Sequence, residues 1–183
     1  MKLLTLSLIS GALSYLSVSL PHLLSLQFKV SYDMLFMLPG LLFGLFILVP
    51  LVGASKHRAL RQVGLMVFSV FAWYVAVSIG FQVLPLIKQS PVLSCGVSGM
   101  IGVLLLAVAS RYLVPIAVGP SSVVWAVIAG FFGGCVIGLA VSLPRASVAS
   151  EVLYFFGFLS WHSSVGLTLF SKGKTDPGNN RPV

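Results

Sequence analysis

The chain has 183 residues, of which 58% are apolar and only 8% are charged, and its mean hydropathy is +1.08. A soluble domain has about 45–50% apolar and about 25% charged residues, and disordered chains are poor in large apolar residues, so both classes are excluded. The net charge of +8 comes from short basic clusters between apolar runs rather than from a basic stripe with interleaved aromatic residues, so no nucleic-acid partner is expected.

Six stretches are long and apolar enough to cross a lipid bilayer as a helix, which takes about 20 residues. In chain order they are approximately residues 3–26, 34–54, 63–86, 92–114, 121–143 and 152–170. Their connections are short, so we expect an all-α integral membrane protein in which residues 1–170 form one six-helix bundle. Residues 171–183 are polar and rich in Gly, Pro, Asn and Lys, and they are predicted to be a disordered cytoplasmic tail.

Proline interrupts the second predicted helix near both of its ends. Pro39 is followed by Gly40 toward the outer end, and Pro50 lies toward the inner end. Proline lacks a main-chain N–H and usually bends a spanning helix, although neighbouring helices can satisfy the carbonyl that it frees. We therefore expect residues 34–54 to form the most distorted helix of the bundle.

Lysine and arginine residues are distributed unevenly between the two sides of this bundle. The side that carries both termini holds Lys2, Lys56, Arg58, Arg61, Arg111, Lys172, Lys174 and Arg181, whereas the other side holds Lys29, Lys88 and Arg145. Cytoplasmic loops of membrane proteins carry the excess of positive charge. The sequence therefore predicts that the N- and C-termini are both cytoplasmic and that the chain is a multi-pass protein of the plasma (inner) membrane.

Small residues recur at helical spacing in three of the predicted helices. They are Gly40 and Gly44 in the second, Gly96, Gly99 and Gly102 in the fourth, and Ala126, Gly130, Gly134 and Gly138 in the fifth. Helices in lipid gain little from hiding apolar surface, so their association depends on the close approach that small residues permit. These residues predict helix-packing faces, either within the bundle or toward a membrane partner subunit or a second copy of the chain.

A few polar and aromatic side chains lie at or near membrane depth. His162 is near the middle of the sixth predicted helix beside Trp161, Trp73 is also mid-span, and Gln82 lies toward the outer face. An ionisable group in the hydrocarbon layer is costly and often functional, and an imidazole changes charge near neutral pH. These four residues are therefore candidates for a ligand or proton site. The alternative for His162 is a neutral imidazole bonded to a main-chain carbonyl or a serine.

The sequence offers no pattern that predicts a metal or cofactor. Cys95 and Cys135 both lie within apolar runs, and neither has a second cysteine or a histidine at zinc-ligand spacing. A Walker-type glycine loop followed by Lys-Ser or Lys-Thr is also missing from the sequence. We expect no metal, no cofactor and no use of ATP by this chain alone.

A Gly-x-Ser-Gly motif and a histidine form the one pattern in the sequence that is typical of a catalytic site. Gly96-Val97-Ser98-Gly99 lies in the fourth predicted helix, and His162 lies in the sixth. This arrangement resembles the rhomboid intramembrane proteases, in which a Gly-x-Ser-Gly serine and a sixth-helix histidine form a dyad, and the resemblance implies that a histidine base activates Ser98. The chain departs from that family in two places. Residues 34–54 lack the histidine and asparagine that help to hold the oxyanion, and the first loop, 27–33, is short.

Three functions follow from these patterns. The first, which the pattern favours, is a permease or a solute-binding transporter subunit without catalytic chemistry, because the helices are interrupted by Pro and Gly around a central polar site. The six-helix substrate-binding components of energy-coupling-factor vitamin transporters are similar in size and topology, an analogy of shape alone. The second is a non-catalytic assembly protein that uses the glycine faces, and the third is an intramembrane serine protease with a Ser98/His162 dyad.

Overall fold

The computed structural model describes residues 2–23, 32–52, 57–83, 90–113, 118–144 and 147–170. These residues are helical almost throughout and contain no strand. The elements are α1 (Lys2–Leu23), α2 (Tyr32–Phe43), η1 (Gly44–Leu48), η2 (Val49–Leu51), α3 (Arg58–Ser78), η3 (Ile79–Val83), α4 (Pro91–Leu113), α5 (Pro120–Ser142) and α6 (Val148–Phe170). The predicted tail at 171–183 lies outside the described residues, as do Lys29, Lys56, Lys88 and Arg145 of the charge pattern.

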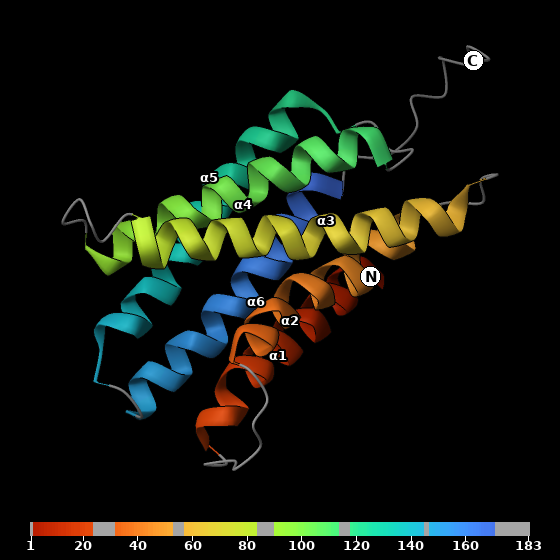
Figure 1. The fold of residues 1–183 in the computed structure, drawn as a ribbon. Helices are drawn as coiled ribbons and strands as arrows, with labels where there is room; N and C mark the ends of the chain where they lie inside the picture. The colour runs from red at the N-terminus through yellow and green to blue at the C-terminus, as the bar shows by residue number, and fades with distance from the viewer. Residues whose placement is uncertain are drawn as a thin grey trace.

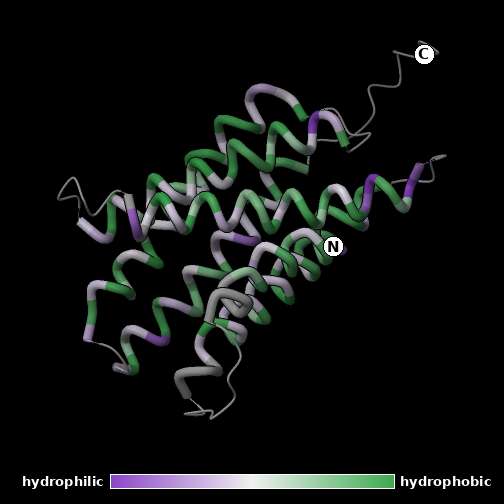
Figure 2. The backbone as a smooth tube through the Cα atoms, in the orientation of Figure 1, coloured by the Kyte–Doolittle hydropathy of each residue, from purple (hydrophilic) through white to green (hydrophobic). Residues whose placement is uncertain are grey.

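Five helices of the described residues, α1, α3, α4, α5 and α6, are long and apolar enough to cross a membrane. This confirms the prediction of an all-α protein with membrane-spanning helices. The second predicted span differs from the other five, because its apolar helical part is the shorter segment Met37–Leu51. Figure 2 shows apolar residues along every helix.

The second segment is distorted, as predicted. The α-helix α2 contains Pro39 and passes directly into the π-helix η1 and then the 3-10 helix η2, which contains Pro50. In the π turn the N–H of Val49 donates to the carbonyl of Gly44, five residues back. Because Pro50 has no N–H, the α-helical bond from residue 50 to residue 46 cannot form. The helix therefore changes its winding just before this proline.

Two helices begin earlier than the apolar runs indicate. Helix α3 begins at Arg58 rather than at residue 63, and α6 begins at Val148 rather than at residue 152. The basic residues at the start of α3 are good helix formers, so hydropathy underestimates the length of the helix. At the start of α6 the hydroxyl of Ser147 accepts a hydrogen bond from the N–H of Ser150 at 3.1 Å, which caps the first turn.

The helices form a ring in chain order. Each of the six helical segments packs against the next one along the chain, and α6 packs back against α1 (Figure 1). Helices α4 and α5 lie side by side along most of their length, and α5 continues the packing onto α6. The buried core fills the inside of this ring and includes Phe43, Ile47, Leu65, Val103, Leu106, Trp161 and Val165.

Candidate functional site

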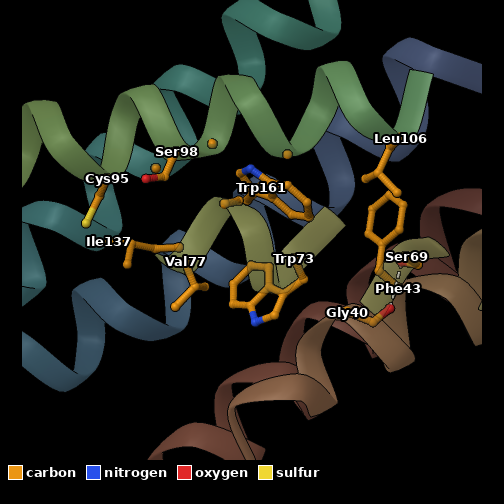
Figure 3. Close-up of a pocket in the computed structure, with 14 residues that line it drawn as sticks. Gly40, Phe43, Ser69, Trp73, Val77, Cys95, Ser98, Leu106, Ile137 and Trp161 are labelled. Carbon is orange, nitrogen blue, oxygen red and sulfur yellow. Dashed lines mark hydrogen bonds between the residues drawn. The ribbon is translucent and has the colours of Figure 1, made fainter. Parts of the chain in front are cut away.

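A cavity lies inside the ring, between α2, α3, α4, α5 and α6 (Figure 3). It has a volume of about 50 Å³, measured for the centre of a water-sized sphere, and it is partly open. One water molecule needs about 10–15 Å³ on this measure, so the cavity has room for several waters or one small ring. Its walls are Gly40, Phe43, Ser69, Trp73, Ala76, Val77, Cys95, Ser98, Gly99, Gly102, Leu106, Gly134, Ile137 and Trp161.

Three aromatic rings from three helices stand at this cavity. The ring of Trp161 is 5.4 Å from that of Phe43, at an interplanar angle of 61°. It is also 5.9 Å from the ring of Trp73, at 75°. Edge-to-face pairs at these separations are favourable, because the positive edge of one ring meets the negative face of the other. Trp161 is therefore held between α2 and α3, and the structure brings the two predicted tryptophans together at one site.

The two hydroxyl groups of the cavity wall are already engaged with the main chain. The hydroxyl of Ser69 donates to the carbonyl of Gly40 at 2.7 Å, and that of Ser98 donates to the carbonyl of Ser94 at 2.8 Å. The described wall contains no charged side chain and exposes almost no polar surface to the cavity. An occupant therefore meets mainly hydrocarbon and aromatic rings.

The small residues singled out in the sequence lie between helices of this same chain. Gly99 and Gly130 face each other main chain to main chain across α4 and α5, and a Cβ on Gly99 would lie 2.9 Å from the carbonyl carbon of Gly130. One turn further along α5, a Cβ on Gly134 would lie 2.8 Å from the carbonyl carbon of Cys95. Gly138 meets α4 in the same way, because its Cβ would lie 2.6 Å from the Cα of Val92.

The other small residues are also packed inside the bundle. A Cβ on Gly96 would lie 2.7 Å from the Sγ of Cys135, and Ala126 is fully buried. In the second segment, Gly40 faces Trp73 and Gly44 faces Met66, both of α3. Gly102 is the least crowded of these glycines, since the atom nearest to a Cβ added there would be the Cβ of Ala76 at 3.3 Å. The glycine faces thus bring α2, α3, α4 and α5 together, and four of these glycines also line the cavity.

His162 lies outside the cavity wall, in the interface between α1 and α6. Its side chain is fully buried, and Nδ1 is 2.9 Å from the hydroxyl oxygen of Ser10. The rings of Phe43 and Trp161 each lie 5.3 Å from the imidazole, and that of Phe158 lies 6.3 Å from it. The Nε2 atom has no hydrogen-bond partner among the described residues. This is the serine-bonded arrangement that the sequence left open as an alternative.

No hydrogen bond joins Ser98 and His162 among the described residues. The hydroxyl of Ser98 is bonded to its own helix, and the only hydrogen bond of the imidazole among the described residues joins it to Ser10. A serine nucleophile needs a base within hydrogen-bond reach of its hydroxyl. Gln82, the remaining candidate, is exposed in η3 and does not line the cavity.

Several cavity residues were not singled out by the sequence. Phe43, Ser69 and Leu106 are residue types common in any membrane helix, so the sequence gives no reason to single them out. They line the same cavity only because of the way α2, α3 and α4 cross. The described residues contain no group of three or more His, Cys, Asp or Glu placed to hold a metal ion.

The chain matches no protein-family model, and neither a curated protein nor a solved structure matches it.

Proposed function

We propose that this protein binds a small solute within the membrane, as a permease or as the solute-binding subunit of a larger transporter, and has no catalytic chemistry of its own. The observation that carries this proposal is the partly open cavity inside the helix ring. Spaces between the helices of a bundle are common ligand sites. The glycine faces are occupied by helices of the same chain, which leaves the assembly function without a specific observation in its favour.

The proposal includes six spans, with both termini in the cytoplasm and the protein in the plasma (inner) membrane. The continuous helical segment from α2 to η2 covers residues 32–51, and 20 residues at about 1.5 Å each match a hydrocarbon layer of about 30 Å. The excess of Lys and Arg on the side of the termini supports the same orientation. A reporter that works only in the cytoplasm, fused to each end in turn, should be active in both fusions. Opposite results would contradict six spans.

A thiol already present in the cavity wall provides the test of solute access. Cys95 lines the cavity and Cys135 does not, and both are free thiols. In a Cys135→Ala variant, the small uncharged reagent methyl methanethiosulfonate should modify Cys95 in native membranes at alkaline pH, since the thiolate is the reacting form. Gly102→Ala should slow this reaction because the added methyl group points into the cavity, where only Ala76 and Trp161 lie within 4 Å of it.

Gly64→Ala is the matched control, because it also adds one methyl group to a helix but meets only the Leu113 side chain, at 3.7 Å. It should leave the labelling rate of Cys95 unchanged. The reverse single-thiol variant, Cys95→Ala, reports the background reaction of Cys135, which Gly102→Ala should not alter. If Cys95 reacts only after the protein is denatured, the cavity is closed to solutes and the proposal fails.

A further inference from the structure

Resting on the proposed solute-binding function, we infer that the solute is an uncharged, apolar aromatic molecule of about one ring, which partitions into the bilayer. The observation behind this inference is the combination of three aromatic rings, from Phe43, Trp73 and Trp161, with a wall that offers almost no polar surface. Charge, polarity, shape and size of the solute each follow from a separate property of this wall.

The wall selects against charged and polar solutes. A charged group without a partner is strongly disfavoured away from water, and a hydroxyl or amide that loses its hydrogen bonds costs about 1–3 kcal/mol. The described wall has no charged side chain to pair with an ion. Its two hydroxyl hydrogens, on Ser69 and Ser98, are donated to main-chain carbonyls. A phenol or a carboxylate would therefore bind more weakly than the parent hydrocarbon ring.

Aromatic character is what separates this solute from the lipid around it. An apolar molecule dissolved among lipid tails is already out of water, so transfer into an apolar cavity gains little from the hydrophobic effect. The preference of the solute for the cavity over the lipid must therefore come from contacts that lipid tails cannot make. Edge-to-face ring pairs provide about 0.5–1.5 kcal/mol each beyond area burial. Trp73 and Trp161 already meet edge to face at the cavity, and a flat ring beside them extends the same packing.

The size of the solute follows from the glycines in the wall. The cavity has room for several water molecules, each of which takes about 30 Å³ in the liquid. Their combined volume is comparable to that of one six-membered ring. Gly102 borders this space, because a Cβ there would contact Ala76 at 3.3 Å and Trp161 at 3.8 Å. A single added methyl group at this position therefore removes a sizeable part of the available volume.

The experiment uses fluorobenzene as the probe and ¹⁹F NMR as the readout, on the full chain in lipid nanodiscs. Nanodiscs without protein provide the signal of the probe in lipid. We expect a shifted or broadened resonance that appears only with the protein and is reversed by benzene. Cyclohexane should compete about fivefold more weakly than benzene at equal concentration in the lipid, because it lacks the ring contacts. Phenol should also compete more weakly, and benzoate should not compete.

Two glycine variants locate the probe. Gly102→Ala should weaken fluorobenzene binding about tenfold, the effect of one methyl group too many in a filled cavity. Gly64→Ala should bind the probe like the unmodified protein. This result would also show that replacing a helical glycine with alanine does not by itself weaken binding. Trp73→Leu keeps an apolar wall but removes one ring. It should reduce the advantage of benzene over cyclohexane.

The outcomes separate this inference from the proposed function. Equal competition by cyclohexane and benzene, or a probe signal unaffected by Gly102→Ala, would overturn the aromatic solute. If Cys95 is accessible in the folded protein and fluorobenzene does not bind, the solute class is wrong while the solute-binding function stands. If Cys95 reacts only in denatured protein, the solute-binding function fails first, whatever the probe does.

Discussion

Ser10 and His162 are 152 positions apart in the chain, yet the Ser10 hydroxyl oxygen lies 2.9 Å from Nδ1 of His162. Both side chains are fully buried between α1 and α6. The close approach of these helices depends on Gly11, where a Cβ would lie 2.9 Å from the Cα of Leu159. A histidine in the hydrocarbon layer is costly unless its nitrogens are satisfied. Ser10 satisfies one of them.

Ser10→Ala should therefore destabilise the protein by about 1–3 kcal/mol, since it leaves both imidazole nitrogens buried without a partner among the described residues. The free energy of unfolding in mixed micelles, titrated with denaturing detergent, measures this change. Ser17→Ala is the control, because the Ser17 hydroxyl donates at 2.8 Å to the Ser14 carbonyl of its own helix. A loss of stability no larger than that of the control would show that the Ser10–His162 bond contributes nothing.

Gly134→Ala tests the contact between α4 and α5. The new methyl group would lie 2.8 Å from the carbonyl carbon of Cys95, so the two main chains must separate. Overpacking of this kind costs about 1–3 kcal/mol. Gly64→Ala should be neutral or stabilising, because alanine favours a helix and its methyl group makes only an ordinary contact with Leu113 at 3.7 Å. Thermal unfolding of the two variants, followed by tryptophan fluorescence, gives the comparison. Equal midpoints would contradict the close α4–α5 contact.

The fold could be predicted because the bilayer imposes strong rules on a sequence. A run of about 20 apolar residues predicts a spanning helix, and the Pro39 and Pro50 pair correctly indicated one distorted segment. The π-helix η3 that follows α3 was not predicted. Hydropathy missed the true starts of α3 and α6, since Arg58 and the Ser147 cap add helical turns that carry little apolar signal. Helix termini depend on capping and charge, which an apolar window does not register.

The candidate site could be predicted only in part. Trp73 and Trp161 stood out because tryptophan is unusual at mid-span, and they do meet at the cavity. His162 stood out as an ionisable residue at membrane depth, yet it faces α1 rather than the cavity. Which side of a helix faces which neighbour is decided by the crossing of whole helices. A helix that is apolar on every face carries no periodic signal of that choice.

Tyr15 and Glu151 form a second link between α1 and α6. The tyrosine hydroxyl donates to the carboxylate at 3.0 Å, in the first turn of α6. A double-mutant cycle with Tyr15→Phe and Glu151→Ala should give a coupling free energy of about 1 kcal/mol, because each single change removes the same charged hydrogen bond. The free energies of unfolding of the four proteins provide this value. Additive losses would show that the two side chains do not interact in the membrane.

Ser98 should not behave as a nucleophile. Its hydroxyl donates to the carbonyl of Ser94, and the nearest polar partner of His162 is Ser10 on another helix, so no base takes the proton of the serine as attack begins. A fluorophosphonate probe applied to the purified protein in lipid should therefore give no covalent labelling that depends on this residue. The comparison is between the unmodified chain and Ser98→Ala, with a known serine hydrolase as the positive control. Labelling that disappears in both Ser98→Ala and His162→Ala would establish a dyad and would replace the solute-binding proposal with an intramembrane hydrolase.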